Sequence, residues 1–454
     1  MKQDNSFLGT EPIGKLLFRL AIPTITAQLV NMLYNLVDRV YLGHMPEVGD
    51  LALTGVGVCM PLILIVSAFS SLVSACGAPR ASIYMGQGDH ESAEKTMGTC
   101  FTAQVLVSLV LTAVLLIWNR DLLLAFGASE NTISYATDYM QLYAVGTVFV
   151  QLTLGMNAYI TAQGYAKMGM LTVIIGAVSN IVLDPLFIFV FGMGVRGAAL
   201  ATILSQAISC VWVLFFLSSG KSLLRLKRDT LAIRPKLLLP CLALGVSPFI
   251  MQSSESLISI CFNSSLLKYG GDTAVGAMTI LSSVMQFSIL PLSGLCQGAQ
   301  PITGYNFGAR KADRVRESFG ILLKSSMIYT TALWLIVMIF PRQVAMLFAG
   351  DGAFLDYTEW ALRIYMALSL LMGIQLACQQ TFIAIGNAKT SLFLAIYRKI
   401  ILLIPLIYIL PRFLEKKDMA VFLAEPVADF VAVTTTAILF AWQFKKAMKQ
   451  LETE

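Results

Sequence analysis

The sequence predicts an all-α polytopic membrane protein with twelve transmembrane helices in two pseudo-symmetric six-helix bundles. Three observations lead to this prediction: the composition, a succession of long apolar segments, and an internal repeat. The chain has 454 residues, of which 57% are hydrophobic and only 13% are charged. A soluble domain carries roughly twice that charged fraction. The apolar surface of this chain therefore needs a lipid bilayer to cover it.

Apolar segments long enough to cross a bilayer follow one another along the whole chain. A transmembrane helix needs roughly 20 such residues, because each residue advances the helix by about 1.5 Å. No stretch between them is large enough for a soluble domain. We expect the twelve spans near residues 15–40, 52–76, 95–117, 132–158, 168–191, 196–217, 238–265, 274–299, 318–340, 357–384, 390–411 and 419–443.

Lys and Arg residues are divided unevenly between the two sides that these spans define. Most of them lie in the termini and in the loops that follow even-numbered spans. Because loops rich in Lys and Arg stay in the cytoplasm, we expect both termini to be cytoplasmic. Basic loops facing anionic lipid also explain the net charge of +6, and no nucleic-acid partner is needed to account for it.

The two halves of the chain repeat each other at a nearly constant offset. IWNRDLLLAF at 117–126 matches IFPRQVAMLF at 339–348, and GYAK at 164–167 matches GNAK at 386–389. Each half holds six spans, an even number, so the repeats are parallel. Such paired bundles typically enclose a substrate site that opens alternately to each side. We divide the chain into an N-terminal bundle, a basic linker and a C-terminal bundle, at 1–217, 218–237 and 238–454.

Four motifs resemble those of the multidrug and toxic compound extrusion (MATE) family. They are NLVDRVYLG at 35–43, SNIVLDPLFIF at 179–189, the GYAK and GNAK turns, and QPITGYNFGARKADRVRES at 300–318. The resemblance covers nearly the whole chain and is greatest to the bacterial MepA-like branch. It implies a secondary transporter of the bacterial inner membrane that exports amphipathic, cationic compounds by antiport with H⁺ or Na⁺. We expect a monomer in contact with membrane lipids, without a cofactor.

Polar residues gather in the outer half of the N-terminal bundle. Asp38 lies in the first span, Asn180 and Asp184 in the fifth, and Thr202 in the sixth. A charge inside a span is costly and marks a functional site by default. Asn180 and Asp184 are four residues apart and share a helix face. Their oxygens would suit Na⁺, and two close carboxylates resist double ionisation, which suits a proton carrier.

The resemblance assigns the same residues to cation coupling. The Asp of the first helix and the Asn and Asp of the fifth form the cation site of the family. Asp38, Asn180 and Asp184 match these positions, and Thr202 matches more weakly. We expect Asp38 and Asp184 to lie within about one water molecule of each other.

Two prolines are candidate hinges. Pro185 follows Asp184 directly, and Pro23 lies in the first span. Proline has no N–H, so each frees the carbonyl four residues earlier and lets its helix bend. We expect ion capture at the acid pair to draw the first and fifth helices together and so to couple ion binding to transport.

Glu255, in the seventh span, is the candidate for the substrate cavity. There it would neutralise a cationic compound, although a hydrogen-bonded core carboxyl is the alternative. Relatives of the NorM type carry a second cation site, with a Glu in the seventh helix and an Asp in the tenth. In this chain the tenth span instead offers only amides at similar depth, namely Gln375, Gln379 and Gln380.

Further charges lie in the last two spans. Arg398 and Lys399 could pair with Asp429, or they could extend toward the inner surface. The sequence leaves the roles of Arg398, Glu425 and Asp429 open.

The alternatives are a flippase and an enzyme. A lipid-linked saccharide flippase of the same superfamily would favour cations in the cavity, and Arg398 keeps that alternative open. An intramembrane enzyme would need a histidine motif at membrane depth, but His44 and His90 lie in loops and HExxH is absent. The sequence also lacks GxxxxGK[ST], which argues against ATP as the energy source.

Overall fold

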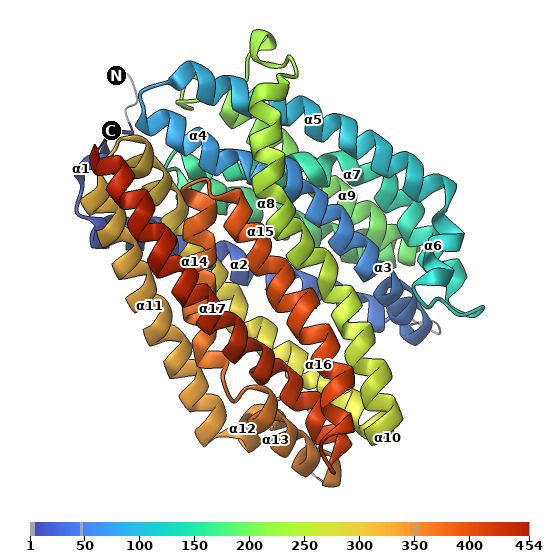
Figure 1. Cartoon of the computed structure of the whole chain (residues 1–454). Coiled ribbons are helices and arrows are strands. Elements are labelled where there is room, and N and C mark those ends of the chain that lie inside the picture. Colours follow the sequence, from blue (N-terminus) through green and yellow to red (C-terminus); the bar gives the residue numbers. More distant parts are fainter. Residues whose placement is uncertain (1–4, 46–48, 349–351, 454) are drawn as a thin grey trace.

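The computed structural model describes residues 5–45, 49–348 and 352–453, and these residues form helices and short connections only (Figure 1). Within this part, ten helices are long and apolar enough to cross a membrane, and a bent pair forms an eleventh span. One of the ten, α10 (Pro235–Gly308), has 74 residues and reverses direction at Gly271, whose φ of 66° favours glycine. Since α10 supplies two spans, the prediction of twelve is confirmed.

The N-terminal bundle follows the order of the sequence. A short helix, α1 (Phe7–Thr10), precedes it. Its spans are α2 (Ile13–Gly43), α3 (Gly49–Ser70) continued through η1 (Ser71–Ala75) into α4 (Gly77–Gly86), α5 (His90–Ile117), α7 (Ile133–Ala162), α8 (Ala166–Pro185) with η2 (Leu186–Val190), and α9 (Val195–Ser218). The short helix α6 (Asn119–Ala125) joins α5 to α7.

The C-terminal bundle repeats this plan. Its spans after α10 are α11 (Ala312–Ile339), α13 (Ala353–Tyr365) with η4 (Ser369–Leu371) and α14 (Met372–Ala384), α15 (Ala388–Ile396) with η5 (Tyr397–Leu403), α16 (Ile404–Ile409) and η6 (Leu410–Arg412), and α17 (Lys417–Thr453). The short helix α12 (Pro341–Met346) occupies the position that α6 has in the first half. The repeat in the sequence is thus also a repeat of secondary structure.

Helices extend beyond several of the predicted spans. The second half of α10 ends at Gly308 rather than near 299, and α11 begins at Ala312 rather than near 318. Hydropathy detects only the part of a helix that lies in lipid, whereas helical hydrogen bonding continues into water. The loop expected between these spans is therefore only a few residues long.

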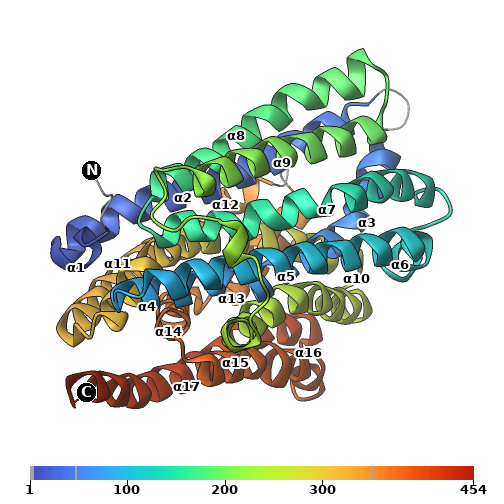
Figure 2. The same cartoon turned by 90° about the horizontal axis from the view of Figure 1, so that it is seen from above.

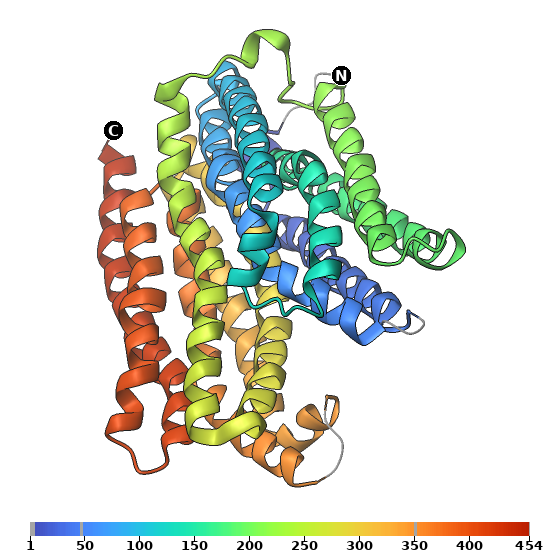
Figure 3. The same ribbon diagram turned by 90° about the vertical axis from the view of Figure 1, so that its right-hand side faces the viewer.

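The two bundles lie side by side, each with its own apolar core (Figure 2). Both termini and the connection from α9 to α10 lie at one end of the molecule, which we call the termini end (Figure 3). Phe262 and Phe422 are fully buried in the C-terminal bundle, and Tyr139 and Tyr143 are buried in the N-terminal one. A third apolar cluster, which includes Leu16 and Leu20 of α2 and Leu295 of α10, joins the two bundles.

Glycines let the bundles meet backbone to backbone near the termini end. A Cβ atom on Gly86 of α4 would lie only 2.0 Å from the carbonyl oxygen of Tyr305 of α10. A Cβ atom on Gly308 would lie 2.0 Å from the carbonyl oxygen of Ile83. No larger residue fits either position without a shift of the backbone. The bundles are therefore in close contact at the termini end.

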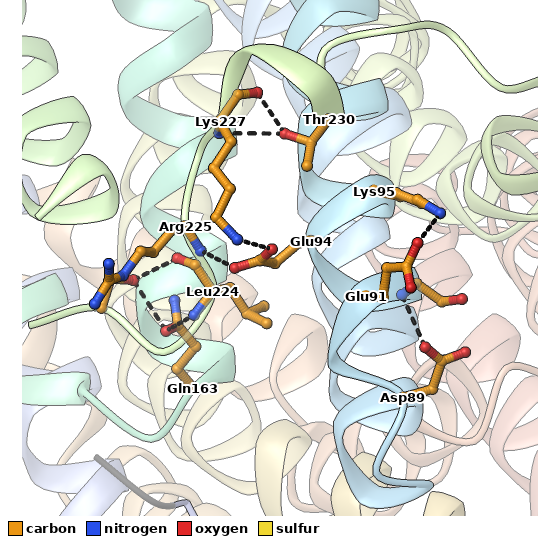
Figure 4. A network of polar contacts seen from close by, with 11 residues as sticks. Asp89, Glu91, Glu94, Lys95, Gln163, Leu224, Arg225, Lys227 and Thr230 are labelled. Atoms are coloured by element: carbon orange, nitrogen blue, oxygen red, sulfur yellow. Dashed lines mark hydrogen bonds and ion pairs between the residues drawn. The ribbon is translucent and has the colours of Figure 1, made fainter. Parts of the chain in front are cut away.

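The linker packs against the N-terminal bundle (Figure 4). Glu94 of α5 accepts hydrogen bonds from the backbone N–H of Arg225 at 2.9 Å and from Nζ of Lys227 at 2.6 Å. Gln163, after α7, accepts one from the backbone N–H of Leu224 at 2.9 Å. These contacts fix the linker to the first bundle. The domain limits given above stay a prediction.

Candidate functional site

Three of the predicted coupling residues come together inside the N-terminal bundle. Asp38 lies on α2, and Asn180 and Asp184 lie on α8, which packs against α2. All three are buried, and Asp184 is fully so. The carboxyl groups of Asp38 and Asp184 are within hydrogen-bonding range of each other. Nδ2 of Asn180 donates to Oδ1 of Asp184 at 3.3 Å.

The oxygens of this cluster lack donors. Oδ1 of Asp38, Oδ2 of Asp184 and Oδ1 of Asn180 are buried without a hydrogen-bond partner among the described residues. Two carboxylates can only accept, so their direct approach in a low dielectric is favourable only with a proton or a cation between them. The arrangement fits one proton or one small, hard cation, which prefers oxygen ligands.

Thr202 lies at the edge of this cluster. It lies near Tyr139, which is close enough to Asp38 to be affected by its charge. Tyr34 of α2 is likewise close to both carboxyl groups. The sequence analysis missed both tyrosines. The spacing of four between Tyr34 and Asp38 was an available signal, whereas nothing in the sequence placed Tyr139 beside Asp38.

The two candidate hinge prolines lie beside the acid cluster and beside a contact between the bundles. The chain widens into the π-helical segment η2 directly after Pro185, next to Asp184. Pro23 lies within α2, beside Thr24, whose hydroxyl donates to the carbonyl of Gly294 in the other bundle at 2.6 Å. α2 thus carries both an acid of the cluster and a contact between the bundles. Bending at Pro23 stays a prediction.

A second group of charges lies inside the C-terminal bundle. Arg398 of η5 donates through Nε to Oδ1 of Asp429 at 2.7 Å and through Nη2 to Oε1 of Glu425 at 3.2 Å. All three side chains are buried. Of the two interpretations that the sequence left open for Arg398, the structure shows pairing with Asp429 rather than extension toward the surface.

Lys399 pairs with a different acid. Its Nζ lies 2.7 Å from Oε1 of Glu255. The lysine side chain is 8% exposed, whereas that of Glu255 is 54% exposed. The substrate-cavity candidate therefore has a cation from its own chain on one oxygen and open space beside it.

Glu255 lies close to a contact between the bundles. Glu255 follows Gln252 at a spacing of three on α10, so these two side chains are neighbours on the helix surface. The ring of Phe249 lies 5.0 Å from that of Phe69, and Gln252 donates to Oγ of Ser71 at 3.2 Å. Both partners belong to the N-terminal bundle. Glu255 lies one turn beyond these contacts.

Comparison with known proteins agrees with this geometry. The model of the MatE family matches residues 23–186 and 248–409, once in each half. A relative called "Multidrug export protein MepA", from Staphylococcus haemolyticus (strain JCSC1435), is 23% identical over 443 residues, which are 95% of each chain. The fold is also that of solved MATE structures.

Two of these structures cover nearly the whole chain. A multidrug resistance MATE family transporter in an outward-facing conformation is 22% identical, with a TM-score of 0.92 over 98% of this chain and 99% of the other. A MATE structure in a bent conformation is also 22% identical and has a TM-score of 0.93 over 100% of both chains. Since the family model covers more than half of the sequence, the chain belongs to the MatE family of MATE transporters.

Proposed function

We propose that the protein exports amphipathic organic cations across the bacterial inner membrane by antiport with H⁺ or Na⁺. The observation that carries this proposal is the buried pair Asp38 and Asp184, whose free oxygens have no donor among the described residues. A structural carboxylate would be satisfied by its surroundings. The name of the staphylococcal relative, a multidrug export protein, supports efflux as the direction.

The acid pair can act on the contact between the bundles through α2. With a proton or cation bound, Asp38 and Asp184 can approach, and α2 packs on α8. Without it, two adjacent carboxylates repel. The same helix touches the other bundle through Thr24, so ion loading and the arrangement of the bundles are linked. The ion and the substrate then compete because each favours a different arrangement of the two bundles. Each shifts the equilibrium by the difference between its affinities for the two arrangements.

The surroundings of the protein follow from the same proposal. A multi-pass protein of this composition contacts membrane lipids over its apolar outer surface. The distribution of Lys and Arg supports cytoplasmic termini, which places the termini end and the linker in the cytoplasm. Two complete bundles in one chain can enclose a site between them, which supports a functional monomer.

The charges of the C-terminal bundle favour an exporter over a lipid-linked saccharide flippase. A flippase needs cations that are free to hold a diphosphate. Arg398, which kept that alternative open, is buried and neutralised by Asp429 and Glu425. An anion would have to displace two carboxylates to reach it.

The test is transport by the purified protein in proteoliposomes, with H⁺ and Na⁺ gradients imposed separately. We expect tetraphenylphosphonium to move against its own gradient when one of the two ion gradients is present. The movement should stop when an ionophore collapses that gradient, and liposomes without protein should show none. If neither gradient drives any amphipathic cation, antiport is the wrong mechanism.

A further inference from the structure

We propose that Lys399 is a tethered competitor for the cationic substrate: its ammonium group occupies the carboxylate of Glu255, and an organic cation binds there by displacing it. This inference rests on the proposed function and identifies a residue that sets its specificity. Lys399 is thus a specificity-determining residue rather than part of the structural core.

The asymmetry of the pair carries the inference. Nζ of Lys399 lies 2.7 Å from Oε1 of Glu255, yet the lysine is 8% exposed and the glutamate 54% exposed. In the structural pair of Arg398 and Asp429, both side chains are buried. In the pair of Lys399 and Glu255 only the cation is buried, and about half of the glutamate side chain is exposed. A ligand that reaches this pair meets the carboxylate before the ammonium group.

The displaced ammonium group has an acceptor nearby. Lys399 is close enough to Glu425 for its charge to act on that carboxyl. The cluster of Glu255, Arg398, Lys399, Glu425 and Asp429 has three acids and two cations, so the acids outnumber the cations by one. When a ligand takes Glu255, Lys399 can turn to Glu425 without being left unpaired.

Only Lys399 of the two cations is free to make this exchange. Arg398 is held by Asp429, by Glu425, and by Sδ of Met372, to which Nη2 donates at 3.3 Å. A lysine side chain has a flexible stem and a compact charge, whereas the planar guanidinium of Arg398 is fixed by several directed bonds. Arg398 therefore holds the cluster together while Lys399 moves.

A consequence for selectivity follows. A ligand must replace the ammonium group at Glu255, so its charge alone gives little net gain. The remainder must come from apolar surface that the ligand buries between the bundles. The pair thus selects large amphipathic cations over small hydrated ones.

The experiment measures equilibrium binding of two probes of matched shape and opposite charge, tetraphenylphosphonium and tetraphenylborate, to the purified protein in detergent. Lys399→Gln should tighten binding of the phosphonium by about tenfold, which corresponds to about 1.4 kcal/mol. It should weaken binding of the borate. Lys389→Gln is the matched control, because Lys389 is an exposed lysine at the start of the same helical segment, and it should change neither.

The Glu255→Gln background isolates the pair. There the phosphonium should bind weakly, and Lys399→Gln should no longer tighten its binding, since the carboxylate for which the two cations compete is gone. Tightening that persists in this background would overturn the inference. So would an unchanged phosphonium affinity in the single variant, or an equal rise for both probes.

A second variant covers the case in which Lys399→Gln does not fold. Lys399→Arg keeps the charge and can hold Glu255 through two parallel hydrogen bonds, so it should weaken phosphonium binding several-fold. Unchanged or tighter binding would contradict the inference. A different result would contradict the proposed function itself: neither the unmodified protein nor any variant would bind an organic cation.

Discussion

The largest contributions of single residues to the stability of this protein come from buried charges. Arg398 is enclosed by Asp429 and Glu425, at 2.7 and 3.2 Å. Burying any of these charges alone would cost several kcal/mol. Each charge can therefore be buried only because its partners are buried beside it. Removal of one partner should cost far more than a surface ion pair would.

The first prediction concerns this cluster. Arg398→Met leaves two buried carboxylates without their cation and should lower the free energy of unfolding by about 3–5 kcal/mol. Asp429→Asn should cost less, because Arg398 can still pair with Glu425. Thermal unfolding of the purified variants in detergent measures both. Equal melting temperatures for Arg398→Met and the unmodified protein would show that the pairing is not structural.

At the residue scale the sequence could identify charges but not their partners. The spacing of Asn180 and Asp184 and their position in a span identified the N-terminal cluster, because helix periodicity alone decides that pair. Lys399 is adjacent to Arg398 in the sequence, yet the two point to different acids. Both lie in the π-helical segment η5, where the regular spacing from which side-chain directions are predicted does not hold.

Among the helices, α2 combines an ion-binding residue with a contact between the bundles. Pro23 precedes both features on this helix and is directly next to Thr24. A proline without an N–H weakens the helix at that level. The helix can then bend near the contact when the ion occupancy of the acid pair changes.

The second prediction tests this hinge. Pro23→Ala restores the hydrogen bond to the carbonyl of Arg19 and stiffens α2, so it should weaken transport more than substrate binding. Pro61→Ala is a suitable control, because Pro61 is another proline within a span of the same bundle. Both quantities are measured on the purified protein. Binding lost in proportion to transport, or no change in either, would remove α2 as the coupling element.

The third prediction concerns the start of α5. Asp89 caps this helix by accepting from the backbone N–H of Ser92 at 2.9 Å (Figure 4). Hydrogen bonds from Ser92 lower the pKa of Asp89 below its ordinary value. The cap therefore stabilises the helix above the ordinary pKa of about 3.9, and its contribution is lost as the pH falls further.

Hydrogen exchange of the first turn of α5 measures this effect. Asp89→Ala should cost about 1 kcal/mol locally at pH 7, which is about a fivefold increase in amide opening. The difference from the unmodified protein should shrink as the pH falls below about 4. Equal protection at pH 7 would show that the cap is dispensable.

At the scale of elements the spans were predictable because each is a long apolar run. The bends and interruptions of the spans were harder to predict. The tenth span bends by 44° between α13 and α14, although its apolar run is continuous. The short helices α6 and α12 were invisible to hydropathy, since they are too short to span. Only their matching sequences in the two halves pointed to a shared structure.

For the whole molecule, the chain start joins the two bundles at the termini end. The carbonyls of Leu8 and Glu11 accept from Nη2 of Arg314 at 3.2 and 2.7 Å, and that of Gly9 accepts from Nζ of Lys311 at 2.8 Å. These are carbonyls at the end of α1, which lack helical partners. They must lose these donors before the bundles separate at this end.

The fourth prediction follows from this contact. Arg314→Met removes two charge-assisted hydrogen bonds and should raise the population open at the termini end by roughly tenfold or more. The labelling rate of Ile83→Cys from that side reports the opening. Arg316→Met is the control, because Arg316 pairs with Asp313 and Glu452 on the surface. Equal labelling rates in the two variants would show that the chain start does not hold the bundles together.

The central claim is that the ion gradient acts through the acid pair of the N-terminal bundle. The most direct measurement is exchange in proteoliposomes: tetraphenylphosphonium is added on one side, and the resulting movement of H⁺ or Na⁺ is recorded. The unmodified protein should move one of these ions in the opposite direction. Asp184→Asn should fold, bind the phosphonium and move no ion. An amide does not take up and release a proton at these pH values, and it has no negative charge to bind a cation. Ion movement by Asp184→Asn at the rate of the unmodified protein would contradict the account.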